Sequence, residues 1–146
     1  MSTIKNNSPA KIETYLNFNG RAEEAIEFYR RALGAEVQMM MRFKDNPEPP
    51  PPGMQSPGSE NKIMHASLKI GATTLMMSDG RCSGKPNFEG FHLSVSAASV
   101  ADAERFFTAL ADGGEVHMPL AKTFFSPSFG MLADRFGVTW MVLVQA

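Results

Sequence analysis

The chain has 146 residues and a formal net charge of −1, with 43% hydrophobic and 20% charged residues. This length and composition predict one globular domain and exclude a mainly disordered chain. Without a basic stripe or a long apolar run, neither nucleic acid nor a membrane is expected as a partner. A single cysteine, Cys82, excludes an internal disulfide and fits a reducing compartment, so a cytoplasmic location is expected.

The first half of the chain carries strand and helix patterns after a polar stretch. Residues 1–11 are expected to form a flexible tail. Apolar and polar residues alternate over 12–18, which predicts a strand, and three-and-four spacing predicts a helix over 21–33 that ends at Gly34. The elements expected next are a strand (37–43), a proline-rich loop (45–60) and a hairpin (62–70 and 72–79).

The second half repeats this order after a connector. The expected elements are the connector (80–86), a strand (90–96), a helix (98–112), a strand (114–119) and a final hairpin (128–134 and 138–145). A loop through Phe124 and Phe125 is expected before that hairpin. The proline-rich loop of the first half (45–60) is long for a compact domain. A loop of that length indicates a pocket lid, an arm onto a second subunit or a disordered insertion.

The two halves also agree residue by residue. Tyr-Leu-Asn-Phe and the helix that follows it correspond to His-Leu-Ser-Val and its helix, with an offset of 77 residues from Leu16 to Leu93 and 79 from Val37 to Val116. Neither copy of such a duplicated unit buries its hydrophobic face alone. The expected organisation is an α+β fold in a single domain (12–146) of two βαβββ modules (12–79 and 90–145).

Four stretches carry a family resemblance. They are Tyr-Leu-Asn-Phe-Asn-Gly (15–20) with Ala-Ile-Glu-Phe-Tyr (25–29), Ile-Met-His-Ala-Ser-Leu (63–68), and Phe-Gly-Met-Leu-Ala-Asp-Arg-Phe-Gly-Val-Thr-Trp-Met (129–141). They resemble the PhnB-like branch of the vicinal-oxygen-chelate superfamily, which includes glyoxalase I, extradiol dioxygenases and bleomycin-resistance proteins. The resemblance implies a cupped mixed sheet around a cavity, and a homodimer.

This branch often carries the label of a 3-demethylubiquinone-9 3-methyltransferase. The chain has no Gly-rich strand-to-helix turn followed by an acidic residue, which a Rossmann-type nucleotide site would show. Methyl transfer is therefore not expected.

Strand alternation predicts which side chains face the cavity that the resemblance implies. In the first strand Leu16 and Phe18 face the helix. In the hairpin the apolar set facing the helix is Met64, Ala66, Leu68 and Ile70, which leaves Ile63, His65, Ser67 and Lys69 for the cavity. Met76, Ser78 and Met141 are assigned by the resemblance. The candidate binding residues are Glu13, Tyr15, Asn17, Met76, Ser78, Ser94 and Met141, and the candidate catalytic residues are His65 and His92.

Metal-dependent relatives hold their ion at four positions, which correspond here to Glu13, Met76, Gly90 and Met141. Glycine offers no ligand and a thioether is a poor one for divalent cations, so one carboxylate remains. Divalent sites normally need three or four oxygen or nitrogen ligands. No metal or other cofactor is therefore expected, although a rearranged site of Glu13, His65 and His92 stays open.

The favoured function is metal-free binding of a small organic molecule in the sheet cavity, because sequestration needs only a pocket and no chemistry. The alternative is a lyase, isomerase or dioxygenase, in which His65 or His92 acts as a general base or as ligand to a displaced metal. A third reading is an accessory subunit with a vestigial cavity. Arg81 and Lys85 flank Cys82 and favour its thiolate, but a lone loop cysteine indicates no catalytic role.

Overall fold

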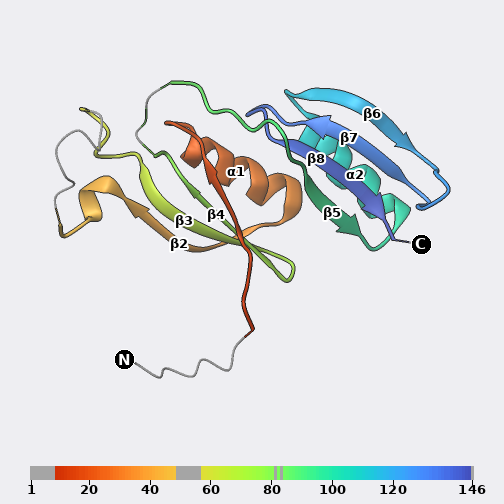
Figure 1. Ribbon diagram of the computed structural model, residues 1–146, viewed down its shortest axis with the longest axis horizontal. Helices are drawn as coiled ribbons and strands as arrows, with labels where there is room; N and C mark the ends of the chain where they lie inside the picture. Colours follow the sequence, from red (N-terminus) through yellow and green to blue (C-terminus); the bar gives the residue numbers. More distant parts are fainter. Residues whose placement is uncertain (1–8, 49–56, 81, 83, 146) are drawn as a thin grey trace.

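Two βαβββ modules lie side by side in the computed structural model, which describes residues 9–48, 57–80, 82 and 84–145 (Figure 1). The first contains β1 (Thr14–Asn17), α1 (Ala22–Leu33), β2 (Glu36–Arg42), a short 3-10 helix (Phe43–Asp45), β3 (Ile63–Ile70) and β4 (Thr73–Ser78). The second contains β5 (Leu93–Ala97), α2 (Val100–Ala111), β6 (Glu115–Ala121), β7 (Phe129–Ala133) and β8 (Thr139–Val144). The predicted α+β fold of two βαβββ modules is confirmed.

Each module forms its own four-stranded mixed sheet. The strand orders are β1-β4-β3-β2 and β5-β8-β7-β6. The first and last strands of each module pair in parallel and the other pairs are antiparallel. The edge strands β1 and β5 lie toward the middle of the molecule, whereas β2 and β6 lie at its outer ends (Figure 1).

Parts of three predicted segments lie outside the described residues. They are residues 1–8 of the expected tail, 49–56 of the expected proline-rich loop, and 81 and 83 of the expected connector. No helix among the described residues is long and apolar enough to cross a membrane.

Helix α1 is stabilised at its start by a carboxylate from the far end of its own module. Its N-cap residue, Arg21, makes no side-chain cap. Instead, Asp79 Oδ1 accepts hydrogen bonds from the backbone N–H groups of Gly20 (2.7 Å) and Ala22 (2.8 Å). Its Oδ2 accepts one from Ile63 (2.8 Å). A negative charge satisfies the unpaired N–H groups of a helix start and complements the helix dipole. Asp79 therefore fixes α1 against β3 and β4.

An aromatic cluster joins the two modules. The rings in contact are Phe18, Phe28, Tyr29, Phe88, Phe136 and Trp140. All six side chains are buried, and α1 also packs against α2. Buried aromatic rings contribute much of the stability of a protein core, so this shared cluster holds the two modules in one fixed arrangement.

A bulge in β3 turns the side chain of Ile63 to the face opposite the predicted one. Met41 of β2 pairs with His65 and Arg42 pairs with Ile63, so Met64 has no partner on β2. One unpaired residue reverses the alternation of side chains along a strand. Ile63 was expected on the cavity side with His65, but it is fully buried in the core.

Candidate functional site

The first candidate site is the face of the first sheet that points away from the core. Leu16 is buried, whereas Tyr15 and Asn17, on either side of it, are exposed. Ser67 in β3 and Met76 in β4 are half-buried between buried neighbours, and His65 in β3 is half-buried between half-buried Met64 and buried Ala66. We call Tyr15, Asn17, His65, Ser67 and Met76 the open face of the first sheet. Tyr15, Asn17, His65 and Ser67 lie on the face that alternation predicts, and Met76 lies on the face that the resemblance implies.

A tyrosine and a histidine contact each other on this open face. Tyr15 Oη lies 3.0 Å from His65 Nδ1, and the two ring centroids are 5.5 Å apart. The residues come from β1 and β3, which are separated by β4, so the side chains meet over that strand. Met76 pairs in register with Tyr15 on one side and with Ser67 on the other. The face therefore places a hydrogen-bonding pair beside a flexible apolar side chain.

The other predicted residues of the first module differ in exposure. Glu13 precedes β1 and is exposed. Asn17 pairs in register with Ser78, the last residue of β4. Ser78 is buried, and its hydroxyl accepts a hydrogen bond from the backbone N–H of Gly80 (2.9 Å). Its oxygen is thus engaged in the turn that follows β4.

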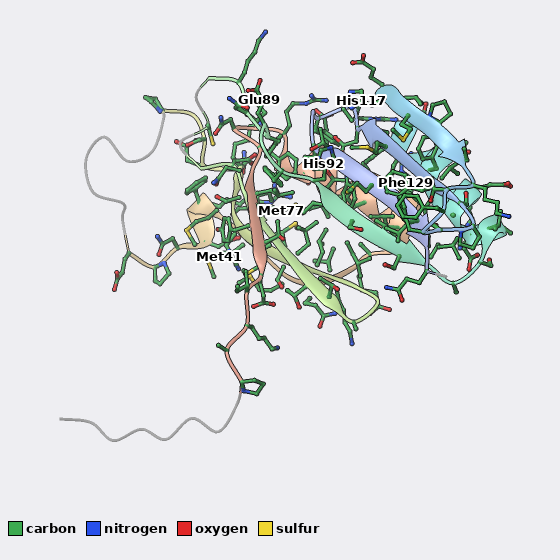
Figure 2. All side chains as sticks on the ribbon, turned by 45° about the vertical axis from the view of Figure 1, so that its right-hand side comes forward. Met41, Met77, Glu89, His92, His117 and Phe129 are labelled. Carbon is green, nitrogen blue, oxygen red and sulfur yellow. The ribbon has the colours of Figure 1, made fainter. Side chains whose placement is uncertain are left out.

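The predicted residues of the second module lie apart from the Tyr15–His65 pair. His92 immediately precedes β5 (Figure 2), and none of the contacts recorded among the described residues joins it to His65. Ser94 in β5 pairs in register with Met141 in β8, and Met141 pairs with Met131 in β7. The structure therefore divides the predicted site between two sheets.

A pocket of about 690 Å³ opens where the two modules meet. Its walls come from the turn between β3 and β4, from β5 with the preceding His92, and from both helices. We call it the intermodule pocket. His92 and Ser94 both line it, together with Thr74, Phe106 and Trp140. The structure thus places two predicted site residues in a cavity that sequence alternation did not predict.

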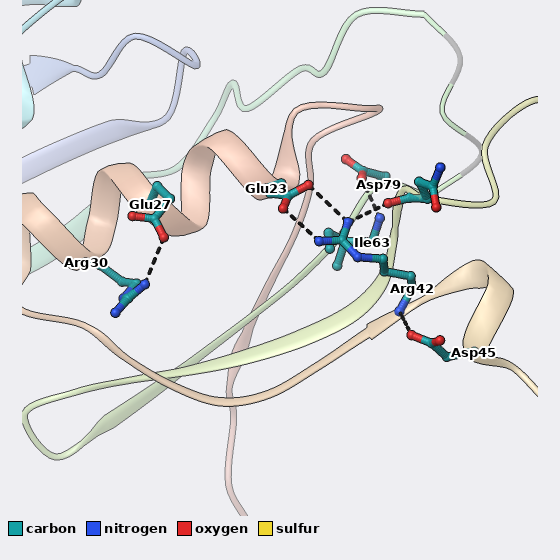
Figure 3. A network of polar contacts seen from close by, with 8 residues as sticks. Glu23, Glu27, Arg30, Arg42, Asp45, Ile63 and Asp79 are labelled. Atoms are coloured by element: carbon teal, nitrogen blue, oxygen red, sulfur yellow. Dashed lines mark hydrogen bonds and ion pairs between the residues drawn. The ribbon is translucent and has the colours of Figure 1, made fainter.

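A second, charged groove of about 460 Å³ runs along α1. Its walls include Glu23, Glu27, Lys62 and Arg135, and these groups have partners within the chain. Glu23 forms a two-point ion pair with Arg42, at 2.7 and 3.0 Å (Figure 3). The hydrogen bond from Arg42 lowers the pKa of Glu23.

The remaining partners in this groove are equally close. Glu27 pairs with Arg30 at 2.8 Å, Lys62 donates to the Gly20 carbonyl at 2.9 Å, and Arg135 pairs with Asp112 at 3.1 Å. These charged groups therefore have partners within the chain, and the Glu23–Arg42 ion pair among them ties α1 to β2.

Sequence reasoning missed the two aspartates that are most completely buried, Asp79 and Asp134. Asp134 accepts hydrogen bonds from Tyr29, Trp140 and two backbone N–H groups of the β7–β8 turn. Burial raises the pKa of Asp134. The available signal was an aspartate placed directly after a strand and before a turn, a position where side-chain oxygens bind backbone N–H groups.

The surroundings of Cys82 disfavour the thiolate that the sequence predicts. Burial, and then the nearby Asp79 carboxylate, raise the pKa of the Cys82 thiol. Arg81 lies outside the described residues. The thiolate that the flanking basic residues had indicated is therefore disfavoured.

The residues at the four inherited metal positions do not fit a divalent cation. Met76 and Met141 offer thioethers, Gly90 offers no side chain, and Glu13 is an exposed carboxylate outside β1. Among the described residues, no three His, Cys, Asp or Glu side chains gather as they would around a metal ion. This holds for His65, His92 and Glu13 as well.

Comparisons with known proteins find matches over most of the chain. Residues 11–142 match the model of the Glyoxalase/Bleomycin resistance protein/Dioxygenase superfamily. The protein YjdN of Escherichia coli K12 is 37% identical over 140 residues, which cover 91% of this chain and 94% of that protein.

Two solved structures are similar over nearly their full lengths. The protein PA1353 of Pseudomonas aeruginosa is 43% identical with a TM-score of 0.81, covering 94% of this chain and 98% of that one. A PhnB protein of Bacillus cereus, described as a putative 3-demethylubiquinone-9 3-methyltransferase, is 29% identical with a TM-score of 0.76, covering 92% and 99%. The duplicated βαβββ modules, the two mixed sheets and these matches agree: the chain is a PhnB-like member of the glyoxalase/bleomycin resistance protein/dioxygenase superfamily.

Proposed function

We propose that the protein binds a small organic molecule on the open face of the first sheet, without a metal ion. The observation that carries this proposal is the contact between Tyr15 and His65 at 3.0 Å, next to Met76. Binding sites typically combine apolar walls with a few polar groups that fix orientation. Methionine adapts its shape to different apolar partners, which suits a binding surface.

The donor set at the inherited metal positions supports the metal-free part of the proposal. Two thioethers, one glycine and one exposed carboxylate favour apolar contact over cation coordination. The proposal is contradicted if purified protein retains stoichiometric zinc, nickel, iron or manganese after dialysis.

The binding test begins with native mass spectrometry of the purified protein, to detect a retained molecule. A panel of small carbonyl, aromatic and phosphonate compounds is then screened by thermal shift. Because a compound at 100 times its Kd stabilises the folded state by about 2.7 kcal/mol, binders raise the Tm measurably. His65→Gln and Tyr15→Phe should each abolish that shift.

A matched control for His65→Gln is His117→Gln. His117 lies on the outer strand β6, where its only recorded partner among the described residues is Glu115, at 4.0 Å. This variant should keep the full thermal shift. A shift that survives His65→Gln unchanged would place the ligand elsewhere.

The Tyr15–His65 contact also favours one alternative, an enzyme in which His65 is a general base. If the Nδ1–H of His65 donates to Tyr15, the lone pair of Nε2 is free to accept a proton from a substrate. A lyase or isomerase reaction would then depend on both residues. Turnover of a panel compound that falls sharply in His65→Gln would favour this alternative over simple binding.

We further propose that the protein acts as a homodimer in the cytoplasm. The outer strands expose apolar side chains, including Val37 and Met39 on β2 and Val116 and Met118 on β6. Exposed apolar patches often mark association surfaces. Analytical ultracentrifugation tests the dimer, and Met39→Glu combined with Met118→Glu should shift the protein toward the monomer.

A further inference from the structure

We propose that the intermodule pocket is a second binding site, for a neutral organic molecule that carries an aromatic ring and a hydrogen-bonding N–H or carbonyl group. The site is separate from the open face of the first sheet, because Tyr15, His65 and Met76 are not among its lining residues. It is built from both modules, so its ligand would contact both.

The volume and walls of the pocket suit a small molecule. About 690 Å³ lies within the range of about 300–1,000 Å³ typical of small-molecule sites. Leu33 at the end of α1, Phe106 in α2 and Trp140 in β8 supply apolar and aromatic walls. Aromatic walls favour ring-bearing ligands through stacked or edge-to-face contacts.

The charge of the walls argues for a neutral ligand. The described residues that line the pocket include no aspartate, glutamate, lysine or arginine. A charged ligand would lose its hydration without gaining an opposite charge, which is costly. His92 is the one titratable side chain among these lining residues, and it stands at the exposed end of β5.

The polar groups of the pocket are available for a ligand. Thr74, Ser94 and Ser96 line it, and their hydroxyls form no hydrogen bond with another described residue. Each hydroxyl can donate one hydrogen bond and accept two. They therefore provide partners for a carbonyl or an N–H group.

The backbone of β5 adds further partners. This strand is the edge of its sheet and pairs with β8 alone among the described strands. In a paired strand, alternate residues direct their N–H and C=O groups away from the partner, and an edge strand leaves them open. A ligand with an amide-like group can pair with this edge as a short strand would.

The only tryptophan of the chain lines the pocket, which makes binding observable. The neutral dye N-phenylnaphthylamine carries aromatic rings and one N–H group, and anilinonaphthalenesulfonate is its sulfonated analogue. Titration of the full chain with each dye is followed by energy transfer from Trp140 and by the single indole N–H signal in NMR spectra. The neutral dye should bind saturably and shift that signal, and the sulfonated dye should bind at least tenfold more weakly.

Matched substitutions locate the dye. Ser94→Phe fills the pocket and should raise the Kd of the neutral dye at least tenfold, whereas Ser67→Phe makes the same change on the open face of the first sheet and should leave the Kd unchanged. If Ser94→Phe does not fold, Thr74→Leu removes a pocket hydroxyl and should raise the Kd as well. The inference is overturned if the neutral dye does not bind, if both dyes bind equally, or if Ser67→Phe weakens binding as much as Ser94→Phe.

Discussion

The phenolic hydroxyl of Tyr29 in α1 donates a 2.6 Å hydrogen bond to the carboxylate of Asp134, which directly follows β7. Trp140 donates its indole N–H to the same oxygen at 2.9 Å. Tyr29 is fully buried and Asp134 is 3% exposed. One buried carboxylate thus receives donors from both modules, and it fixes how the two sheets sit around the intermodule pocket.

We expect Tyr29→Phe to lower the free energy of unfolding by about 1.5–3 kcal/mol, since a hydrogen bond to a charged buried group is worth that much. Urea denaturation followed by circular dichroism measures the change. Tyr15→Phe is the matched control, because Tyr15 is exposed and its loss should cost less than about 1 kcal/mol. Equal losses in the two variants would contradict a special role for the Tyr29–Asp134 bond.

We expect the stability contributed by Asp134, compared with Asn at this position, to fall as the pH rises. Burial raises the pKa of Asp134 in the folded state, so the folded protein holds this proton to a higher pH than the unfolded chain does. The contribution is complete below the unfolded pKa of about 3.9 and is lost as the pH passes through the folded pKa. The difference in unfolding free energy between the wild type and Asp134→Asn should therefore be larger near pH 4 than near pH 7.

Urea denaturation of both proteins across this range measures that difference, and the effects of other titrating groups cancel in it. A difference that grows with pH would show that the hydrogen bonds to the carboxylate outweigh its burial.

Sequence alternation was sufficient to place Tyr15 and His65 on one face, because β1 is regular and the bulge in β3 lies on the Ile63 side of His65, so the alternation from His65 to Leu68 is undisturbed. It failed at Ile63, since the bulge at Met64 is a feature of pairing between strands and leaves no mark in the local pattern. Alternation also gives the face of a strand but not the position of one sheet relative to the other. For that reason it did not separate Ser94 from the Tyr15–His65 pair.

The polar contacts that hold the modules together could not be predicted from the sequence either. Tyr29 and Asp134 are 105 residues apart, and the local spacing of apolar residues predicts the helix that carries Tyr29 but not its partner. The duplication predicted the fold because each copy repeats local patterns. It did not predict the bonds between copies, which the repeat itself does not contain.

We expect Asp79→Ala to lower the free energy of unfolding by about 3 kcal/mol or more. The substitution leaves three backbone N–H groups without their partner, on Gly20, Ala22 and Ile63, and each buried unsatisfied donor costs about 1–3 kcal/mol. Asp79→Asn keeps one acceptor oxygen and should cost less. Asp102→Ala on the first turn of α2 is the control, because the half-buried Asp102 carboxylate forms a surface ion pair with Arg105. A loss there as large as that of Asp79→Ala would contradict the capping role.

We expect neutral His65 to carry its proton on Nε2, so that the unprotonated Nδ1 accepts the hydrogen bond from the Tyr15 hydroxyl. Nitrogen-15 NMR of the labelled imidazole at alkaline pH measures this, since protonated and unprotonated ring nitrogens have well-separated chemical shifts. Tyr15→Phe removes the donor and should mix the two tautomers of His65, while the signals of His92, in the other module, should not change. A proton found on Nδ1 in the wild type would instead leave Nε2 unprotonated and able to act as a base, and would favour the enzymatic alternative over simple binding.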